Sequence, residues 1–352
     1  MTARARPGTQ PRLDFIVGLP RSGSTWLSYA LGRHPDVAVF GETSFFGRLF
    51  VPPRADGTYG RRELERVRTR QHARGWQETT GDSPPGLVGT SAAPYPALVD
   101  DVFGRIRPPV RPAEVLSAIA SEVARHEGKA RVVEKTPHHV HWLPRLASSY
   151  PDARFVVTFR DPYEFAVSFL GLGRRLPIRT ARALDLPWRH PLVAALFWRS
   201  YASAVERALA QYPDRTLLVR LEEVRERPSK VLAGVQAFLE LPQVDLAGAE
   251  GANSSFAGAV RPPPDGVTVA WMNAVSGRAI RRSGYTQRPA NASLPSAALS
   301  LLAAPLSVAA TVARIPALVP GPLISYVRDW RLRWTTVDSE LRHRRAHDKG
   351  IC

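Results

Sequence analysis

A short apolar run that leads through a glycine-containing loop into a helix constrains the fold of this chain more than any other feature. A buried strand is predicted over residues 13–17, Leu-Asp-Phe-Ile-Val. The next residues, Gly18 to Thr25, match the frame G-x-x-x-x-G-x-[ST] of a phosphate-binding loop. In such a loop, backbone N–H groups surround an anion at the N-terminus of the following helix, here predicted over 24–33. A tight turn without a ligand is the alternative interpretation.

The loop departs from the pattern of ATP-hydrolysing enzymes in its cation. Ser24 stands where those enzymes place the Lys that neutralises the β- and γ-phosphates. The cation of this loop is Arg21, three residues earlier. We therefore expect a phosphate that carries no magnesium-bound triphosphate tail.

A second strand-to-helix junction carries another candidate phosphate site. A buried strand is predicted to end at Arg160, and Pro162 suits the first turn of the next helix because its missing N–H costs nothing there. Ser168 follows about two turns along that helix. A guanidinium offers forked, charge-assisted contacts to phosphate, and a hydroxyl adds a neutral donor. The alternative is a surface pair of Arg160 with Asp161 beside an ordinary helical serine.

Together the two motifs resemble those of the sulfotransferases that use 3′-phosphoadenosine-5′-phosphosulfate (PAPS). Residues 20–27, Pro-Arg-Ser-Gly-Ser-Thr-Trp-Leu, are similar to the family's 5′-phosphosulfate loop. Arg160, with a serine eight residues later, is similar to the family's 3′-phosphate pair. The resemblance implies PAPS as co-substrate and no metal ion. It also implies a set of donor-binding residues: Arg21, Ser22, Gly23, Ser24, Thr25, Trp26, Arg160 and Ser168.

Weaker similarities extend the resemblance over about residues 13–285. They are Glu-Lys-Thr-Pro at 134–137, a strand and helix with an acidic pair at 217–224, and a helix that ends in Gly-Tyr at 284–285. The acidic pair, Glu222 and Glu223, is interpreted as structural, because such charges usually lie solvated at helix starts. The resemblance implies that Lys135 stabilises charge near the transferred sulfuryl group.

The general base is less directly matched. In cytosolic relatives a histidine follows the Lys-Thr pair, but Pro137 stands there in this chain. Carbohydrate-modifying and bacterial relatives use a glutamate shortly after the first helix, and Glu42 matches that placement. The resemblance therefore implies Glu42 as the base, with Lys135 and Arg21 as the other catalytic residues. A surface carboxylate or a helix cap is the alternative for Glu42.

A group of histidines after Lys135 is the second candidate for catalysis or acceptor contact. It comprises His138, His139 and His141, of which the first and last could share one helix face. The neighbouring Trp142 favours simple packing instead.

The alternation of strands and helices predicts an α/β fold with three layers, α/β/α, around a mostly parallel central sheet. The resemblance implies the P-loop NTPase-like sulfotransferase fold. Predicted strands cover 13–18, 37–40, 131–134, 154–159 and 215–220, and predicted helices cover 24–33, 114–126, 138–148, 162–171, 192–211 and 228–239. Ligands of such sheets bind beyond the carboxyl ends of the strands, where Gly18, Glu42, Lys135 and Arg160 all fall.

Three parts are expected along the chain. These are a flexible basic arm at 1–12, a sulfotransferase domain at 13–288, and an apolar helical segment with a basic tail at 289–352. Within the domain, residues 51–111 are rich in Pro, Gly and Arg, and are predicted to be an insertion or lid that shapes the acceptor site, with a short helix near 61–73. Residues 289–313 carry no charge. They could pack on the domain, lie on a membrane surface or cross a membrane.

Charge and composition bound the partners. The net charge of +17 favours anionic partners such as a nucleotide donor, acidic lipid or nucleic acid. No specific nucleic acid is expected, because no zinc-finger or helix-turn-helix signature is present. Peripheral contact with an anionic membrane stays open. The resemblance implies a hydroxyl acceptor on a carbohydrate, a lipid or glycolipid, or another small molecule such as a secondary metabolite.

The expected compartment is the cytoplasm, with attachment to a membrane surface left open. The lone cysteine, Cys352, fits a reducing compartment, and residues 1–10 lack the apolar core of a signal peptide. The abundance of Arg, Ala and Pro suggests a bacterium with a GC-rich genome.

Two other functions are alternatives. A P-loop kinase or other nucleotide-binding protein would use ATP and Mg²⁺, and the missing loop lysine argues against it. A non-enzymatic basic protein that binds nucleic acid or membranes would leave the pair Arg160 and Ser168 unexplained.

Overall fold

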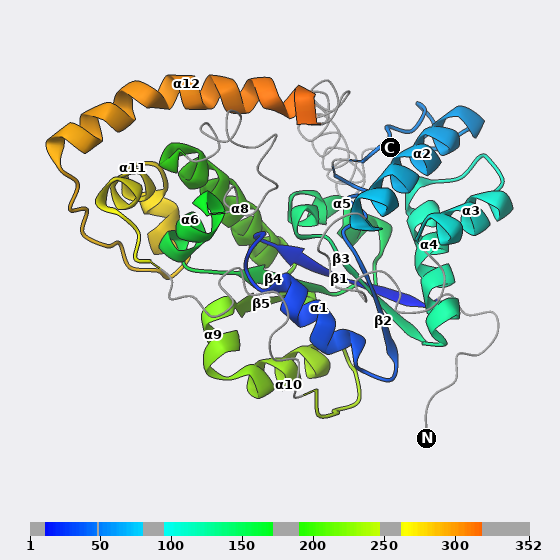
Figure 1. Ribbon diagram of the computed structural model, residues 1–352. Helices are drawn as coiled ribbons and strands as arrows, with labels where there is room; N and C mark the ends of the chain where they lie inside the picture. Colours follow the sequence, from blue (N-terminus) through cyan, green and yellow to red (C-terminus); the bar gives the residue numbers. More distant parts are fainter. Residues whose placement is uncertain (1–10, 48, 80–94, 172–189, 247–261, 319–352) are drawn as a thin grey trace, which may run out of the picture.

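A sheet of five parallel strands forms the centre of the protein (Figure 1). The computed structural model describes residues 11–47, 49–79, 95–171, 190–246 and 262–318. The strands are β1 (Arg12–Gly18), β2 (Val37–Gly41), β3 (Arg131–Lys135), β4 (Phe155–Phe159) and β5 (Thr216–Arg220). They lie in the order β2-β3-β1-β4-β5, and each neighbouring pair is parallel. The predicted α/β fold with a parallel sheet is confirmed.

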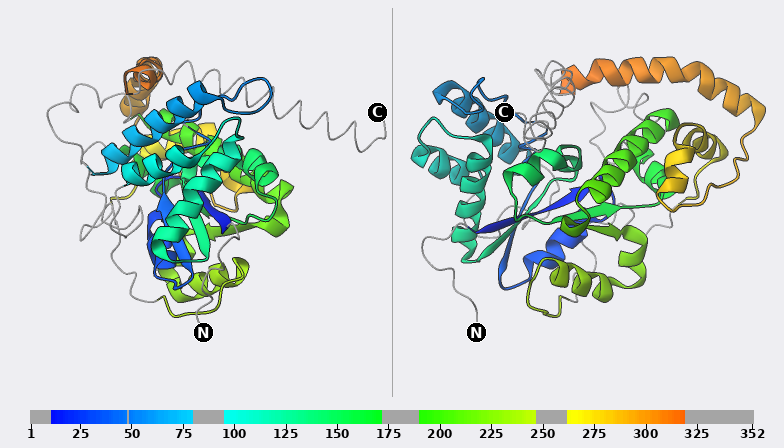
Figure 2. Two further views of the ribbon diagram at one scale, coloured as in Figure 1. Left: turned by 90° about the vertical axis from the view of Figure 1, so that its right-hand side faces the viewer. Right: turned by 180° about the vertical axis from the view of Figure 1, so that it is seen from behind.

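Helices cover both faces of this sheet (Figure 2). One face carries α1 (Ser24–Gly32), α9 (Leu221–Glu226) and α10 (Pro228–Phe238). The other carries α4 (Pro112–Glu127), α5 (Leu143–Ser149), α6 (Pro162–Leu170), α8 (Pro191–Gln211) and α11 (Gly266–Arg282). Side chains of β1 alternate between the two cores: Phe15 and Val17 enter one, and Ile16 enters the other. This two-sided burial explains why the strands are continuous apolar runs.

The carboxyl ends of the five strands lie along one edge of the sheet. From β3, on one side of β1, the chain crosses to β4 on the other side. The crevice outside the carboxyl end of β1 is therefore a topological switch point, the usual ligand site of open parallel sheets. The glycine loop follows β1 at this point.

The described parts of the segment 51–111, residues 51–79 and 95–111, contribute two helices at the side of the sheet (Figure 1). Helix α2 (Arg61–Thr79) extends beyond the predicted short helix at 61–73, and the sequence interpretation missed α3 (Tyr95–Arg105). Leu98, Val99 and Val102 of α3 are buried, which gives this helix its apolar face. An antiparallel bridge between Tyr59 and Val110 joins the two ends of the segment.

Two predicted boundaries need correction. Strand β1 begins at Arg12, so the predicted arm at 1–12 overlaps it by one residue, and residues 1–10 lie outside the described part of the chain. The predicted helix at 138–148 consists of a 3₁₀ helix, η1 (Pro137–Trp142), followed by α5. Another 3₁₀ turn, η4 (Pro213–Arg215), precedes β5.

The last described helix, α12 (Leu294–Leu318), runs across α11 and α8 at the outside of the molecule (Figures 1 and 2). Within the described residues, no helix combines the length and the apolar character needed to cross a membrane.

Candidate functional site

The glycine loop is fixed against strand β4. Gly18 has a φ of 127°, and a Cβ placed there would lie 2.2 Å from the carbonyl oxygen of Thr158. This close approach allows the Leu19 N–H to donate to the same oxygen at 2.8 Å, and the Ser22 hydroxyl to donate to Thr158 Oγ1 at 2.7 Å. Gly23, with a φ of 84°, then precedes the first turn of α1. The loop therefore has a defined shape that only glycine permits at its start.

The two candidate phosphate motifs meet at this loop. Arg160, only 2% exposed, donates from Nη1 to the carbonyl oxygen of Arg21 at 2.8 Å. Arg21 in turn directs its Nε toward the Ser168 hydroxyl at 3.5 Å, the outer limit of a hydrogen bond. Ser168 is buried on α6. Residues 139 to 147 positions apart in the sequence therefore form one cationic and hydroxyl-bearing site beside the helix α1 N-terminus.

A carboxylate links Arg160 to a second arginine. Glu164 Oε2 accepts hydrogen bonds from Arg160 Nη2 and Arg225 Nη1, both at 2.7 Å. Burial alone would raise the pKa of Glu164, but its bonds to Arg225 and Arg160 outweigh burial and lower that pKa below its ordinary value. Glu164 therefore stays ionised and holds both guanidinium groups next to the loop.

The start of α6 is tied to the C-terminal part of the domain. Asp161 caps the helix by accepting from the N–H groups of Tyr163 and Glu164. Glu222 accepts from the Asp161 N–H at 2.8 Å and from the Tyr285 hydroxyl at 3.2 Å. These contacts agree with the structural role interpreted for Glu222.

The candidate base and the candidate catalytic lysine form an ion pair. Lys135 Nζ lies 2.7 Å from Glu42 Oε1, where the side chain of Lys135 is 2% exposed and that of Glu42 is 39% exposed. The Glu42 N–H also donates to the Lys135 carbonyl oxygen at 2.6 Å. Strands β2 and β3 are neighbours, and Gly41 pairs with Lys135 in their register. Glu42, the next residue, therefore lies at the carboxyl edge of the sheet. Glu42 is thus partly open to solvent while its partner is buried.

A fully buried carboxylate holds the loop that presents Glu42. Glu134 Oε1 accepts from the Thr43 hydroxyl at 2.8 Å, from the Thr43 N–H at 3.3 Å and from the Thr136 hydroxyl. Its other oxygen, Oε2, lies 3.0 Å from His139 Nδ1. The Phe46 N–H donates to His139 Nε2 at 3.2 Å, so the imidazole proton that faces Glu134 is on Nδ1. One network therefore fixes residues 43–46.

Glu134 keeps its charge in this dry environment. Burial would raise its pKa, but the pairing with His139 and the hydrogen bonds from Thr136 and Thr43 outweigh burial and lower the pKa below its ordinary value. From the sequence, Glu134 is visible only as part of the Glu-Lys-Thr-Pro similarity. An acidic residue at the end of an otherwise apolar strand was the available signal.

The three histidines separate into two environments. His139 is fully buried in the network just described. His138 hydrogen-bonds through Nδ1 to the Tyr201 hydroxyl on α8, and the ring of His141 lies 4.4 Å from that of Tyr201. The predicted shared face of His138 and His141 is therefore present, since residues three apart are eclipsed on a 3₁₀ helix. Both rings contact Tyr201.

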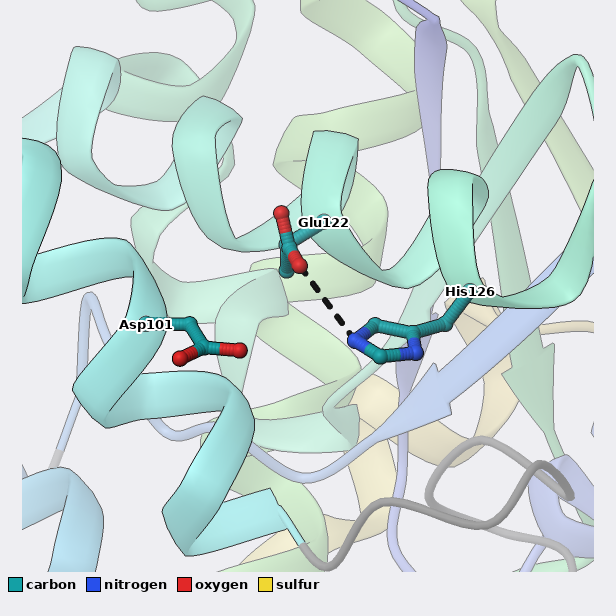
Figure 3. Close-up of side chains that lie close together, drawn as sticks. All are labelled: Asp101, Glu122 and His126. Carbon is teal, nitrogen blue, oxygen red and sulfur yellow. Dashed lines mark ion pairs between the residues drawn. The ribbon is translucent and has the colours of Figure 1, made fainter.

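One further cluster has ligand types that could hold a metal ion (Figure 3). Asp101, Glu122 and His126 come within 4.8 Å of one another on α3 and α4. Both Glu122 oxygens already bind guanidinium groups, of Arg105 and of Arg125, each at 2.5 Å. Burial would raise the pKa of Glu122, but the bonds from Arg125 and Arg105 outweigh it and lower that pKa. Two adjacent cations oppose a divalent ion, so the cluster fits an ion-pair network better than a metal centre.

Comparison with known proteins identifies the family. The model of the sulfotransferase family matches residues 15–245, a span that includes the glycine loop, Glu42, Lys135, Arg160 and Ser168. The chain belongs to the sulfotransferase family. The resemblance inferred from the motifs is confirmed.

The individual relatives are distant in sequence. The chain is 23% identical over 237 residues to a Caenorhabditis briggsae protein with a provisional protein-tyrosine sulfotransferase name, covering 65% of this chain and 66% of that protein. It is 26% identical over 239 residues to the nodulation protein NoeE of Sinorhizobium fredii, covering 65% and 50%. The chain therefore spans between half and just under two thirds of these curated relatives.

Two solved sulfotransferases align with about four fifths of the chain. The sulfotransferase STF9 of Mycobacterium avium aligns with a TM-score of 0.49 and 15% identity, covering 80% of this chain and 79% of that one. The sulfotransferase domain from the curacin biosynthetic pathway aligns with a TM-score of 0.47 and 18% identity, covering 79% and 99%.

Proposed function

We propose that this sulfotransferase moves the sulfuryl group of PAPS to a hydroxyl acceptor. The observation that carries the proposal is the contact of Arg160 with the glycine loop, which joins the two phosphate motifs into one site. The chemical groups of this site suit the phosphate and sulfate groups of PAPS. The site offers loop N–H groups, hydroxyls and two guanidinium groups, which are the donors that bind phosphate and sulfate oxygens.

The donor would be held at both of its charged ends. Residues 21–26 of the loop and the α1 N-terminus would bind the 5′-phosphosulfate. Arg160 and Ser168 would bind the 3′-phosphate. Arg225 is placed beside them through its shared contact with Glu164. A nucleotide that lacks the 3′-phosphate should therefore bind more weakly than one that carries it.

Glu42 would act as the general base. When bound, PAPS supplies an activated sulfuryl group and leaves as 3′-phosphoadenosine-5′-phosphate (PAP). Glu42 would accept the proton of the acceptor hydroxyl as its oxygen bonds to sulfur. Lys135 and Arg21 would stabilise the negative charge that develops on the departing phosphate. The ion pair at 2.7 Å orients Glu42 and Lys135 before the acceptor arrives.

The acceptor is proposed to be a hydroxyl on a carbohydrate, a lipid or another small molecule. The direct experiment incubates the full-length protein and ³⁵S-labelled PAPS with separate lipid and carbohydrate extracts, followed by mass spectrometry of labelled products. A P-loop kinase would instead bind ATP with Mg²⁺, so competition by PAP but not by ATP favours the proposal. Failure of labelled PAPS to bind would contradict it. We place the reaction in the cytoplasm.

The base assignment has its own test. Glu42→Gln keeps the shape of the side chain and removes its basicity. Turnover with an acceptor identified by the labelling experiment should therefore fall by about 10²-fold or more. Affinity for PAP should change little. Glu65→Gln is the matched control, because Glu65 is an exposed α2 carboxylate paired with Arg68, and we expect it to be silent. Turnover that survives Glu42→Gln would exclude Glu42 as the base while leaving the donor site intact.

A further inference from the structure

Helix α12 presents its leucines to the outside. The large apolar side chains that are exposed among the described residues number six, and five of them are on α12. The five are Leu294 (87% exposed), Leu299 (70%), Leu301 (62%), Leu302 (77%) and Leu306 (76%), together called the leucine face. Single exposed leucines are ordinary, but a contiguous group on one helix marks an interaction site.

Two serines of the same helix, Ser300 and Ser307, face the protein instead. Ser300 Oγ accepts from Trp271 Nε1 at 2.8 Å, and the Ser300 carbonyl oxygen lies 3.0 Å from His190 Nε2. The Leu192 N–H donates to His190 Nδ1, so Nε2 carries the proton and donates to that carbonyl. Ser307 is also buried, at 8% exposed. A helix that faces water shows the opposite arrangement, with serines outside and leucines inside.

The exposed arc is apolar throughout. Between residues 294 and 309, each exposed position is Leu, Pro or Ala. At 100° per residue these positions fall within an arc of about 160° around the helix axis. Residues 289–313 carry no charge, so no ionic group interrupts the arc. The segment that leads into the helix packs closely on α11, since a Cβ at Gly266 would lie 2.2 Å from the Asn291 carbonyl oxygen.

We propose that the leucine face lies in the interfacial layer of an anionic lipid bilayer. The net charge of +17 repels a second copy of the chain and attracts an anionic membrane. The sequence beyond the helix adds seven Arg or Lys against four Asp or Glu between 328 and 349, a net charge of +3. Apolar side chains inserted at the acyl boundary, together with basic residues near lipid headgroups, define interfacial membrane binding. The views from the side show α12 at the outermost surface, where a flat bilayer can reach it (Figure 2).

Vesicle sedimentation of the full-length protein tests this proposal. The vesicles contain equal parts of phosphatidylglycerol and phosphatidylcholine, or phosphatidylcholine alone. The unmodified protein should bind the anionic vesicles and bind the neutral ones more weakly, and 0.5 M salt should weaken binding. The triple substitution Leu299→Glu, Leu302→Glu and Leu306→Glu should weaken binding at least tenfold. Because all three side chains are exposed, circular dichroism and the Tm should change little.

A matched control separates apolar insertion from net charge. Ala97→Glu, Ala233→Glu and Ala237→Glu add the same negative charge at exposed positions of α3 and α10. This control should weaken binding much less than the leucine substitutions. Equal losses in both variants would overturn the proposal, because charge alone would then explain binding. If the triple glutamate variant does not fold, Leu→Ser at the same positions replaces it.

Two other outcomes would also overturn the proposal. The unmodified protein could ignore anionic vesicles at low salt. Alternatively, light scattering could show a dimer that the leucine substitutions convert to a monomer, which would make a second copy the occupant of the leucine face. None of these outcomes bears on PAPS binding, so failure of this proposal and failure of the proposed reaction are distinguishable.

Discussion

Replacing Glu134 by glutamine should change two measurable quantities. It should lower the free energy of unfolding, and it should lower turnover by displacing Glu42. The carboxylate accepts from Thr43 and Thr136 through one oxygen and from His139 through the other. An amide has one acceptor oxygen and one NH₂ donor. In one orientation the NH₂ of the amide faces the Thr43 N–H, and in the other it faces the N–H of His139 Nδ1, so a buried donor loses its acceptor either way. Moving the imidazole proton to Nε2 only transfers the conflict to the Phe46 N–H.

The expected magnitude follows from these contacts. One unsatisfied buried donor costs about 1–3 kcal/mol. The remaining hydrogen bonds lose their charged acceptor, which removes about another 1 kcal/mol. We therefore expect Glu134→Gln to lower the free energy of unfolding at pH 7 by about 3 kcal/mol, measured by urea denaturation. Movement of residues 43–46 should also displace Glu42, and misplacement by about 1 Å lowers turnover by roughly 10²-fold.

Asp14→Asn is the matched control. Asp14 is also a buried carboxylate of the sheet, but it lies at the amino end of β1, where it accepts from Arg131 Nη2 at 2.7 Å and from the Arg154 N–H at 2.8 Å. Its replacement should destabilise the fold without a comparable loss of turnover in the folded fraction. Equal losses of turnover in the two variants would mean that Glu134 is only structural.

A double-mutant cycle with Glu42→Gln gives a second readout. If Glu134 acts through Glu42, then Glu134→Gln should have little further effect on turnover once Glu42 has been replaced. Fully additive losses would refute the positioning role. An unfolding free energy that stays within about 0.5 kcal/mol of the unmodified value would refute the hydrogen-bond argument itself.

Other consequences of the structure can be measured directly. Arg160→Ala should weaken PAP binding more than Ser168→Ala does, because a charged hydrogen bond contributes about 1.5–3 kcal/mol against about 1 for a neutral one, and calorimetry would show the order. Gly18→Ala should destabilise the fold strongly in thermal unfolding, because the added Cβ meets the Thr158 backbone at 2.2 Å. Since the pKa of Glu122 is lowered, its contribution to stability is present above the unfolded-state pKa of about 4.3 and is lost as pH falls through the folded-state pKa, so Glu122→Gln should destabilise at pH 7 and destabilise progressively less as the solution is acidified below about pH 4. Zn²⁺ or EDTA should leave the Tm unchanged, and a Zn²⁺-dependent increase would show that the cluster at Glu122 binds metal.

The fold was predictable because strands buried on both faces are continuous apolar runs. The predicted strand 131–134 and the observed Arg131–Lys135 differ by one residue, as do 154–159 and Phe155–Phe159. Parallel strands also end at a common edge, so the meeting of Arg21 and Arg160 could be anticipated. Helix α3 was not predicted. Its apolar face lies within a segment rich in Pro and Gly, and such a composition is typical of loops.

The role of Glu134 could not be read from the sequence. A glutamate at the end of a strand usually faces solvent, whereas this one is fully buried. Its partner Thr43 is 91 residues away, and that pairing follows only from the adjacency of β2 and β3. The leucine face could not be predicted for a similar reason. The sequence shows the uncharged segment, but the side of the helix that faces the protein is set by the contacts of Ser300 with Trp271 and His190.

Backbone strain connects the two halves of the candidate site. Among the described residues, the non-glycine residues with positive φ include Arg21 (67°), Glu42 (40°) and Ser44 (47°). A left-handed backbone costs about 1–2 kcal/mol per residue, so each must be held by its surroundings. Arg160 binds the Arg21 carbonyl, and the Glu134 network holds the backbone that follows Glu42. Arg21, the candidate cation for binding PAPS, and Glu42, the candidate base, therefore occupy strained backbone positions that buried contacts hold in place. This arrangement is expected where side chains must be oriented before the substrate binds.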